Sequence, residues 1–514
     1  MDQACDTDRR PDAAMGAAAS GVAGANTTTR AQPTAGPTPG NGQPLRMPSP
    51  PMPTPPGLGW TLAATSLGLV VVQIDITIVN VALPHIGSQL TAGIGGLQWV
   101  VDAYTLAFAA FLLSAGALGD RLGSRGTYLL GMIVFGVASL ACGIAPNTPV
   151  LIAARAFQGL GAAMVLPTSL SLIAHACGEN HRARTRAIGI WSSTGGAAVA
   201  AGPVIGGFLI DDFGWRSIFL VNIPLCILAV WWTLRSVAET VKHQQRGGFD
   251  PLGQILGIIT LFCLTGAVIE AGPRGWNDNL VLSGLIAAAI GACAFIAAEL
   301  ANRHPMVPLG FFKRSTFSAA VLIGIISNFT FYGLIFVLSL YFQEVRHYSP
   351  AETGLAFLPL TGIFIIANIF SGWIASRIGF RWPMTGGLIV GAIGFGLLCR
   401  VGPDTPFTYM APVLALIPIG TGTAIPAMTA AVLATVERQR AGTASAVLNT
   451  ARQVGGAMGV ALFGALVASQ DVTKGLDDTF AISAVMLAVA GLIAYFGIKP
   501  TGGQVDWNAG AGGH

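Results

Sequence analysis

Two charged side chains lie inside apolar stretches of the sequence. Asp75 lies in VVQIDITIVNVALP, residues 71–84, and Arg155 lies in LIAARAFQGLGAAMVLP, residues 151–167. In a helix that spans a bilayer, each charge costs on the order of 3 kcal/mol, so such groups usually have a function. Burial favours the protonated form of a carboxylate and a nearby arginine opposes this, so a change in their separation would bind or release a proton. We therefore favour proton coupling by this pair over the alternative, a static ion pair that holds two helices together.

A second group of polar residues is expected deep in the protein. Arg452 lies eleven residues after Ala441, where a predicted helix begins, and this spacing corresponds to a depth of ~16 Å. Together with Asn449, Gln453 and Asn328, it could line a central cavity or form a hydrogen-bond network between helices. The sequence favours neither alternative.

Asp102, Tyr104 and Gln158 are further candidates for the wall of a substrate cavity. Asp102 and Tyr104 lie near the start of a helix predicted from residue 99. Three roles are open for Asp102: a second proton site, a contact for a cationic substrate, or a solvated charge at a loop end. We favour the solvated charge, because ionisable groups are rare inside a bilayer.

The composition requires that these residues be positioned by membrane-spanning helices. Of the 514 residues, 53% are hydrophobic and 10% are charged, whereas a soluble domain carries about 25% charged residues. From Trp60 onward, apolar segments of roughly 20 residues alternate with short polar loops, as spanning helices do. We predict an all-α polytopic membrane protein with fourteen transmembrane helices at residues 61–84, 99–119, 127–146, 149–174, 187–210, 217–235, 253–271, 280–300, 316–342, 354–375, 382–400, 407–434, 442–468 and 478–498.

The basic residues of the loops predict the orientation. Sixteen Lys and Arg residues lie in the loops after even-numbered helices and just after the last helix, and five lie in the loops on the other side. Because loops rich in Lys and Arg stay in the cytoplasm, both termini are expected to be cytoplasmic, in a cell-membrane protein. Residues 1–58 lack an apolar run and are expected to be a disordered tail, and residues 499–514 a second cytoplasmic tail.

The sequence contains an internal repeat. GALGDRLGSRG (116–126) is echoed by GWIASRIGFRW (372–382), and RTRAIG (184–189) is echoed by RQRAGT (438–443). The echoes predict two pseudo-repeats of six helices, residues 59–236 and 302–498, with a linker and two inserted helices at 237–301. Parallel six-helix repeats with a cavity between them are typical of major facilitator transporters.

Six motifs, in order, resemble those of the fourteen-span drug:proton antiporters of the major facilitator superfamily. They are IDITIVNVALP (74–84), GALGDRLGSRG, LIAARAFQGLGAAMVLP, AGPVIGGFL (201–209), WRSIFLVNIP (215–224) and LNTARQVGGAMGVALFG (448–464). WVVDAY (99–104) and SNFTFYG (327–333) are most similar to the methylenomycin-type antibiotic exporters. Two departures are Ile74, where leucine is usual, and Ser124, which replaces a usual basic residue.

The resemblance implies a gating role for two of these motifs. In GALGDRLGSRG, Gly116 and Gly123 permit a tight turn, and Asp120 could accept hydrogen bonds from the other half, while Arg121 and Arg125 could instead only fix the orientation of the loop. In AGPVIGGFL, the small residues allow two helices to approach closely and rock. These small residues are Gly202, Pro203, Gly206 and Gly207.

These features together predict a proton-coupled antiporter that exports small, largely apolar drugs or antibiotics by alternating access. The alternative is a major facilitator symporter that takes up a small metabolite, and the AGPVIGGFL motif, which the family uses mainly in exporters, weighs against it. An enzyme is not expected, because no His, Cys or acidic cluster lies in the spans, and no P-loop motif is present for an ATP-driven pump. We expect no cofactor, metal site or nucleic-acid partner, and a monomer in the lipid bilayer whose ligands are its substrate and protons.

Overall fold

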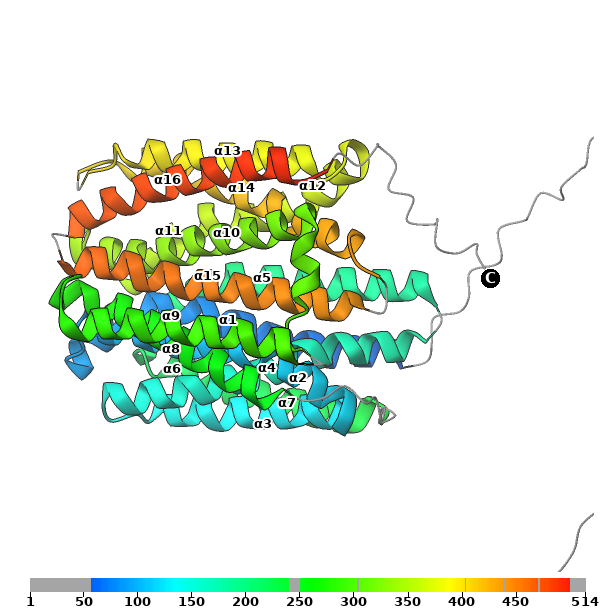
Figure 1. Ribbon diagram of the computed structural model, residues 1–514. Coiled ribbons are helices and arrows are strands. Elements are labelled where there is room, and N and C mark those ends of the chain that lie inside the picture. Colours follow the sequence, from blue (N-terminus) through cyan, green and yellow to red (C-terminus); the bar gives the residue numbers. More distant parts are fainter. Residues whose placement is uncertain are drawn as a thin grey trace, which may run out of the picture. The chain divides into compact units, whose positions relative to one another are not determined.

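The computed structural model describes residues 57–178, 180–239, 250–302, 305–402, 404–437, 440–469 and 472–499. The predicted terminal tails therefore lie almost wholly outside the described residues. The described residues form an all-helical structure, in which long helices lie side by side along one direction (Figure 1). We call the end at which the first helix begins the proximal end, and the end at which the second helix begins the distal end.

The elements, in chain order, are α1 (Leu58–Leu90), α2 (Ile94–Leu122), α3 (Ser124–Gly143), α4 (Thr148–Cys177), α5 (His181–Phe213), α6 (Ser217–Leu220), α7 (Asn222–Ser236), α8 (Pro251–Arg274), α9 (Asn279–Ala301), η1 (Leu309–Lys313), α10 (Ser315–Leu340), η2 (Tyr341–Val345), α11 (Pro350–Ala356), α12 (Leu358–Ile378), α13 (Arg381–Leu398), α14 (Phe407–Ala434), α15 (Ala441–Ser469) and α16 (Val472–Gly497).

Thirteen helical segments of the described residues are long and apolar enough to cross a membrane. They match thirteen of the fourteen predicted spans, and α13, which covers the predicted span 382–400, is not among them. Several helices are longer than predicted. In particular, α1 continues six residues past Pro84, and α2 begins five residues before residue 99.

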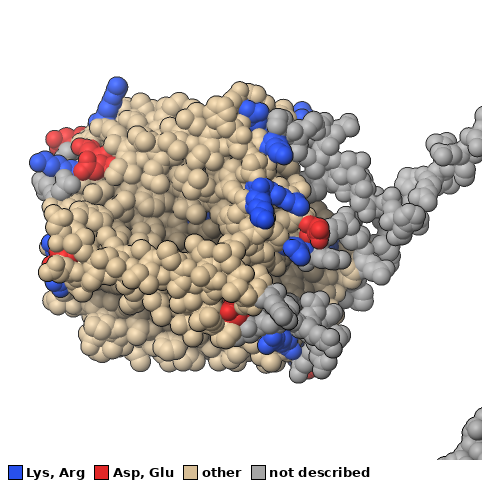
Figure 2. Space-filling view, in the orientation of Figure 1, with Lys and Arg blue, Asp and Glu red and all other residues tan. Residues whose placement is uncertain are grey.

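The surface between the two ends of the helices is that of a protein surrounded by lipid. Figure 2 shows the Lys, Arg, Asp and Glu side chains of this face gathered mainly at the two ends, with uncharged surface between them. Large apolar side chains are exposed along the helices, among them Phe157, Ile290 and Phe496. Since a soluble monomer rarely exposes large apolar patches, this surface supports a multi-pass membrane protein.

Burial separates central from peripheral helices. Each span contains an apolar stretch of 18 residues. In the span formed by α10 and η2, 83% of this stretch is buried, whereas in α9 only 17% is buried. Helix α8 packs against α9, α15 and α2, so α8 and α9 form a hairpin on the outside of the helices that carry the candidate site.

The same packing pairs occur twice along the chain. In the first half, α1 to α7, the main pairs are α1–α5, α2–α4, α3–α4, α3–α7 and α1–α7. In the second half, α10 to α16, the pairs α10–α15, α12–α14, α13–α14, α13–α16 and α10–α16 repeat this pattern in the same order.

The two halves contact each other through α2–α15, α5–α11, α5–α12 and α1–α10. Several of the hydrogen bonds between them lie toward the distal end. Ser339 donates to the carbonyl of Asn80 (2.5 Å), Gln343 donates to the carbonyl of Val81 (2.9 Å), and Gln98 donates to the carbonyl of Ala461 (2.6 Å). The distal end of the described structure is therefore closed by direct contact between the halves.

Candidate functional site

Asp75 and Arg155 form an ion pair in the interior of the first half. Nη1 of Arg155 lies 2.5 Å from Oδ2 of Asp75, and the two side chains are 1% and 0% exposed. A buried pair of this kind is costly to desolvate and is stabilising only when further hydrogen bonds satisfy both partners. The sequence analysis treated the two residues as an interacting pair, and the structure brings them into direct contact.

Three further side chains complete the environment of the carboxylate. Gln158 Nε2 donates to Oδ1 of Asp75 (2.7 Å), and Asn222 Nδ2 donates to the same oxygen (3.0 Å). Ser139 accepts hydrogen bonds from Gln158 (2.8 Å) and Asn222 (3.4 Å). Asp75 therefore accepts hydrogen bonds from three donors, on Arg155, Gln158 and Asn222. Gln158, expected in a cavity wall, instead belongs to this buried cluster.

Neighbouring helices fix the guanidinium of Arg155. Its Nε donates to the carbonyl of Val100 (3.1 Å), and its Nη1 also donates to Oε1 of Gln158 (2.7 Å). The ring of Tyr104 stacks on it, with 4.4 Å between Cζ and the ring centroid. Gly159 makes this approach possible, because a Cβ there would lie 2.2 Å from the carbonyl oxygen of Tyr104.

Protonation of Asp75 would disturb this cluster. A carboxylic acid needs an acceptor for its O–H, yet Arg155, Gln158 and Asn222 all point donors at Asp75. Asn222 Oδ1 is buried and has no partner among the described residues, so rotation of this amide would supply the acceptor. The cluster can therefore hold two arrangements, one for each protonation state.

Sequence reasoning missed Asn222 and Ser139. Asn222 lies in the quoted segment WRSIFLVNIP, where a single amide in an apolar run was a usable signal. Ser139 lies in GVASLACG and is too small and common to stand out.

The expectation that Asp102 is a solvated charge is wrong. Its side chain is 0% exposed, and neither carboxylate oxygen has a partner among the described residues. The reason is that α2 begins at Ile94, which places Asp102 more than two turns inside the helix. Tyr104 is likewise buried, and its hydroxyl has no partner in the described part of the chain.

The polar residues of α15 and α10 meet in the second half. Arg452 donates from Nε to Oδ1 of Asn328 and from Nη1 to Oδ1 of Asn449, each at 3.3 Å. Gln453 lines a cavity of about 10 Å³ together with residues of α1, α2 and α10, namely Ile76, Val101, Thr105 and Tyr332. A space of this size holds about one water molecule.

The small residues of α5 lie at a three-helix contact near the distal end. A Cβ on Gly202 would lie 2.0 Å from Thr77 Oγ1, and one on Gly206 would lie 2.5 Å from Ile78 Cγ1, both on α1. A Cβ on Gly207 would lie 2.4 Å from the carbonyl oxygen of Pro350, at the start of α11. The carbonyl of Pro203 fits against Gly354 in the same way. These residues therefore pack α5 against α1 of its own half and against α11 of the second half.

The GALGDRLGSRG motif forms the turn between α2 and α3. Gly123 has φ 92°, a left-handed conformation that favours glycine. Arg125 donates to the carbonyl of Leu234 (2.9 Å) and pairs with Glu239 (3.4 Å), both of the first half. Gly116 and Arg121 lie on α2, and the side chain of Asp120 lies outside the described residues.

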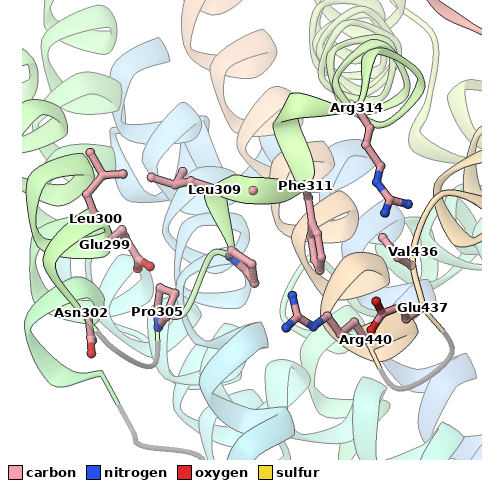
Figure 3. A pocket seen from close by; sticks show the side chains of 12 residues that line it. Glu299, Leu300, Asn302, Pro305, Leu309, Phe311, Arg314, Val436, Glu437 and Arg440 are labelled. Atoms are coloured by element: carbon pink, nitrogen blue, oxygen red, sulfur yellow. The ribbon is translucent and has the colours of Figure 1, made fainter.

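A roomier cavity, of about 400 Å³, lies apart from these residues at the proximal end. It is bounded by the end of α9, by η1 and by the segment between α14 and α15. Figure 3 shows Arg314, Glu437 and Arg440 on one side of it and Glu299 and Leu300 on the other. None of the predicted site residues lines this cavity.

The sequence matches a protein-family model and named resistance proteins of bacteria. Residues 65–460 match the family model described as Major Facilitator Superfamily. The chain is 36% identical over 407 residues to the "Methylenomycin A resistance protein" of Bacillus subtilis (strain 168), a match covering 79% of this chain and 87% of that protein. It is 37% identical over 410 residues to "Multidrug resistance protein Stp" of Mycobacterium tuberculosis (strain CDC 1551 / Oshkosh), covering 80% and 76%.

Among solved structures, the fold is similar to that in "Crystal structure of a POT family transporter in complex with 5-aminolevulinic acid", with a TM-score of 0.64 and 14% identity over 85% of this chain and 95% of that one. The resemblance to methylenomycin-type proteins inferred from the motifs is therefore confirmed. The matched family model, the identities to relatives and the many apolar helices lead to one conclusion: this chain is a multi-pass membrane protein that belongs to the major facilitator superfamily.

Proposed function

We propose that the chain is a proton-coupled antiporter that exports small, largely apolar drugs or antibiotics. The observation that carries the proposal is the buried Asp75–Arg155 pair, surrounded by amides that can serve either protonation state. The relatives named for methylenomycin and multidrug resistance favour export over uptake of a metabolite.

The proposed architecture has fourteen spans, arranged as six, two and six. Two features support it. The packing pairs of α1 to α7 recur in α10 to α16, and α8 and α9 lie outside the helices of the site. In this arrangement α13 is the fourteenth span. It occupies the same position in the second half as α3 in the first half, because α13 packs against α14 and α16 as α3 packs against α4 and α7. The proximal end is cytoplasmic, which follows from the excess of Lys and Arg in the loops at that end, and a monomer contains every residue of the site.

Alternating access accounts for the contacts at the distal end. The described structure is closed there by Asn80, Val81 and Gln98 and by the glycines of α5. With the proximal end cytoplasmic, this is the state that takes up substrate from the cell. Release outside requires these contacts to separate while the proximal ends of the halves come together.

Asp102 is the second acid of the proposed mechanism. Neither of its carboxylate oxygens has a partner among the described residues, whereas Asp75 accepts hydrogen bonds from Arg155, Gln158 and Asn222. Burial without a partner is costly for a charged carboxylate, so the two acids offer a proton different surroundings. Helix α2, which carries Asp102, packs against α15 of the other half, so a rearrangement of the halves acts on this helix.

The test compares the wild type with Asp75→Asn, which preserves the shape of the side chain and cannot titrate. Sensitive cells expressing each protein are challenged with methylenomycin A and a panel of other apolar antibiotics. The wild type should confer resistance and Asp75→Asn should not, at equal membrane levels. Purified wild type in weak buffer should also release a proton when a transported antibiotic is added. Full resistance conferred by Asp75→Asn would show that Asp75 is a structural ion pair.

A further inference from the structure

Arg452 differs from Arg155 in having no anion beside it. Arg155, on α4, is 1% exposed, whereas Arg452, on α15, is half-buried. Arg155 is paired with Asp75, whereas no carboxylate of the described residues forms an ion pair with Arg452. Its two hydrogen-bond acceptors are the neutral amides of Asn328 and Asn449, both at 3.3 Å, a long distance for such bonds.

Arg452 has N–H groups that could donate hydrogen bonds to a ligand. A guanidinium carries five N–H donors, and two of those of Arg452 are used. Arg452 is half-buried, and a charge partly shielded from water with no anion beside it is costly. An anionic ligand would therefore gain more from binding here than from binding to an arginine already neutralised by a carboxylate.

The surroundings of Arg452 include a tyrosine and no described carboxylate that pairs with it. Tyr332 on α10 lies against α15, since a Cβ on Gly456, four residues after Arg452, would lie 3.0 Å from its ring. Tyr332 also lines the small cavity between the halves, next to Gln453.

From these contacts we infer that Arg452, with Asn328 and Asn449, binds an anionic group of the substrate, such as a carboxylate or an enolate. The inference rests on the proposed export function and names its substrate class: apolar organic acids. The two amides hold the guanidinium in place and keep it oriented, and the apolar remainder of the substrate occupies the space between the halves as they separate. Arg–carboxylate recognition of this kind is strong and directional.

The experiment uses three fluorescent probes that share one ring system: 1-naphthaleneacetate, its neutral primary amide, and the cationic 2-(1-naphthyl)ethylamine. Binding of each to the purified full-length protein is measured by fluorescence titration. The acid should bind about 10- to 100-fold more tightly than the other two, which is the range expected for hydrogen bonds to a charged group. Arg452→Gln should abolish the difference, and Arg452→Lys should restore part of it, since lysine keeps the charge without the planar donor pattern.

Arg314→Gln is the matched control, because Arg314 is an exposed guanidinium at the proximal cavity and its loss should leave the preference for the acid unchanged. Equal binding of the three probes, binding of none, or a preference that survives in Arg452→Gln would overturn the inference and leave Arg452 as part of an interhelical network. The export proposal is tested separately, by Asp75-dependent antibiotic resistance, and would stand if only the preference for the acid failed.

Discussion

At the scale of single residues, Asp75 and Asp102, the two fully buried aspartates of α1 and α2, are in opposite situations. Asp75 has a cation and two amides, and Asp102 has no partner among the described residues. Removal of one member of a buried pair leaves an uncompensated charge, whereas replacement of a lone neutral acid by an amide does not. The two aspartates should therefore respond differently to the same substitution.

Asp75→Asn should lower the thermal unfolding temperature of the purified protein, because Arg155 then stays buried without an anion, a change that costs about 3 to 5 kcal/mol in buried pairs. Asp102→Asn should leave this temperature unchanged or raise it. Thermal unfolding in detergent, followed by intrinsic fluorescence, compares the two variants. A large loss of stability in Asp102→Asn would mean that Asp102 is ionised and has a partner.

Asn222 should matter for transport through its unpartnered oxygen. Asn222→Ala removes one donor to Asp75 and the acceptor that its protonated form would use, so the rate of Asp75-dependent efflux should fall about tenfold, the effect of losing a hydrogen bond worth 1 to 2 kcal/mol. Ser139→Ala is the control, since Ser139 bonds to the amides but not to Asp75. An equal loss in both variants would assign Asn222 a packing role.

At the scale of elements, the glycines of α5 decide how closely three helices meet. The α1 and α11 atoms near Gly202, Gly206 and Gly207 lie where a Cβ would stand. This contact joins the two halves at the distal end, so it must break and re-form in every transport cycle if the proposed alternating access is right.

Gly207→Ala should therefore impair closure of the distal end, because its Cβ would lie 2.4 Å from the carbonyl oxygen of Pro350. Overpacking of this kind costs about 1 to 3 kcal/mol, which corresponds to roughly a 5- to 150-fold shift toward the distally open state. Gly189→Ala on the same helix is the control, since nothing lies within 4 Å of its Cβ position.

The readout is the labelling rate of a cysteine introduced at Val81, which lies at the distal contact between α1 and Gln343. Gly207→Ala should raise the labelling rate from outside the cell, and Gly189→Ala should not. If labelling is unchanged by Gly207→Ala while transport is lost, the glycine face affects only the folding or packing of α5.

At the scale of the whole molecule, the two proposed sites determine the net charge that crosses the membrane in one transport cycle. These are the proton site at Asp75 and the anion site at Arg452. Export of a monoanion in exchange for one proton moves two positive charges inward, and each charge gains about 2.3 kcal/mol per 100 mV of membrane potential. Export of a neutral compound for one proton moves a single charge.

In proteoliposomes with a potassium diffusion potential, the rate of 1-naphthaleneacetate transport should therefore rise more steeply with potential than that of its neutral amide. The comparison is made on the same preparation, so differences in protein orientation cancel. The same slope for both probes would contradict the expected charge stoichiometry of acid export.

The amino-acid sequence by itself predicted the class and the thirteen spans that the described helices match, because each of these depends on local properties. Apolar length fixes a span, and an ionisable residue within it is costly wherever the helix is packed. This is why Asp75, Arg155 and the glycines of α5 could be proposed as site residues without a structure, and their roles stay predictions. The family resemblance to methylenomycin-type proteins is confirmed.

Only the tertiary structure decided which side chains meet. Asn222 and Ser139 join Asp75 because α7 and α3 pack beside α1 and α4, and Gln158 joins them rather than a cavity wall. Asp102 is buried because α2 begins one turn earlier than its apolar pattern indicated. Helix ends and contacts between distant segments depend on packing across the whole molecule, and a local pattern cannot specify them.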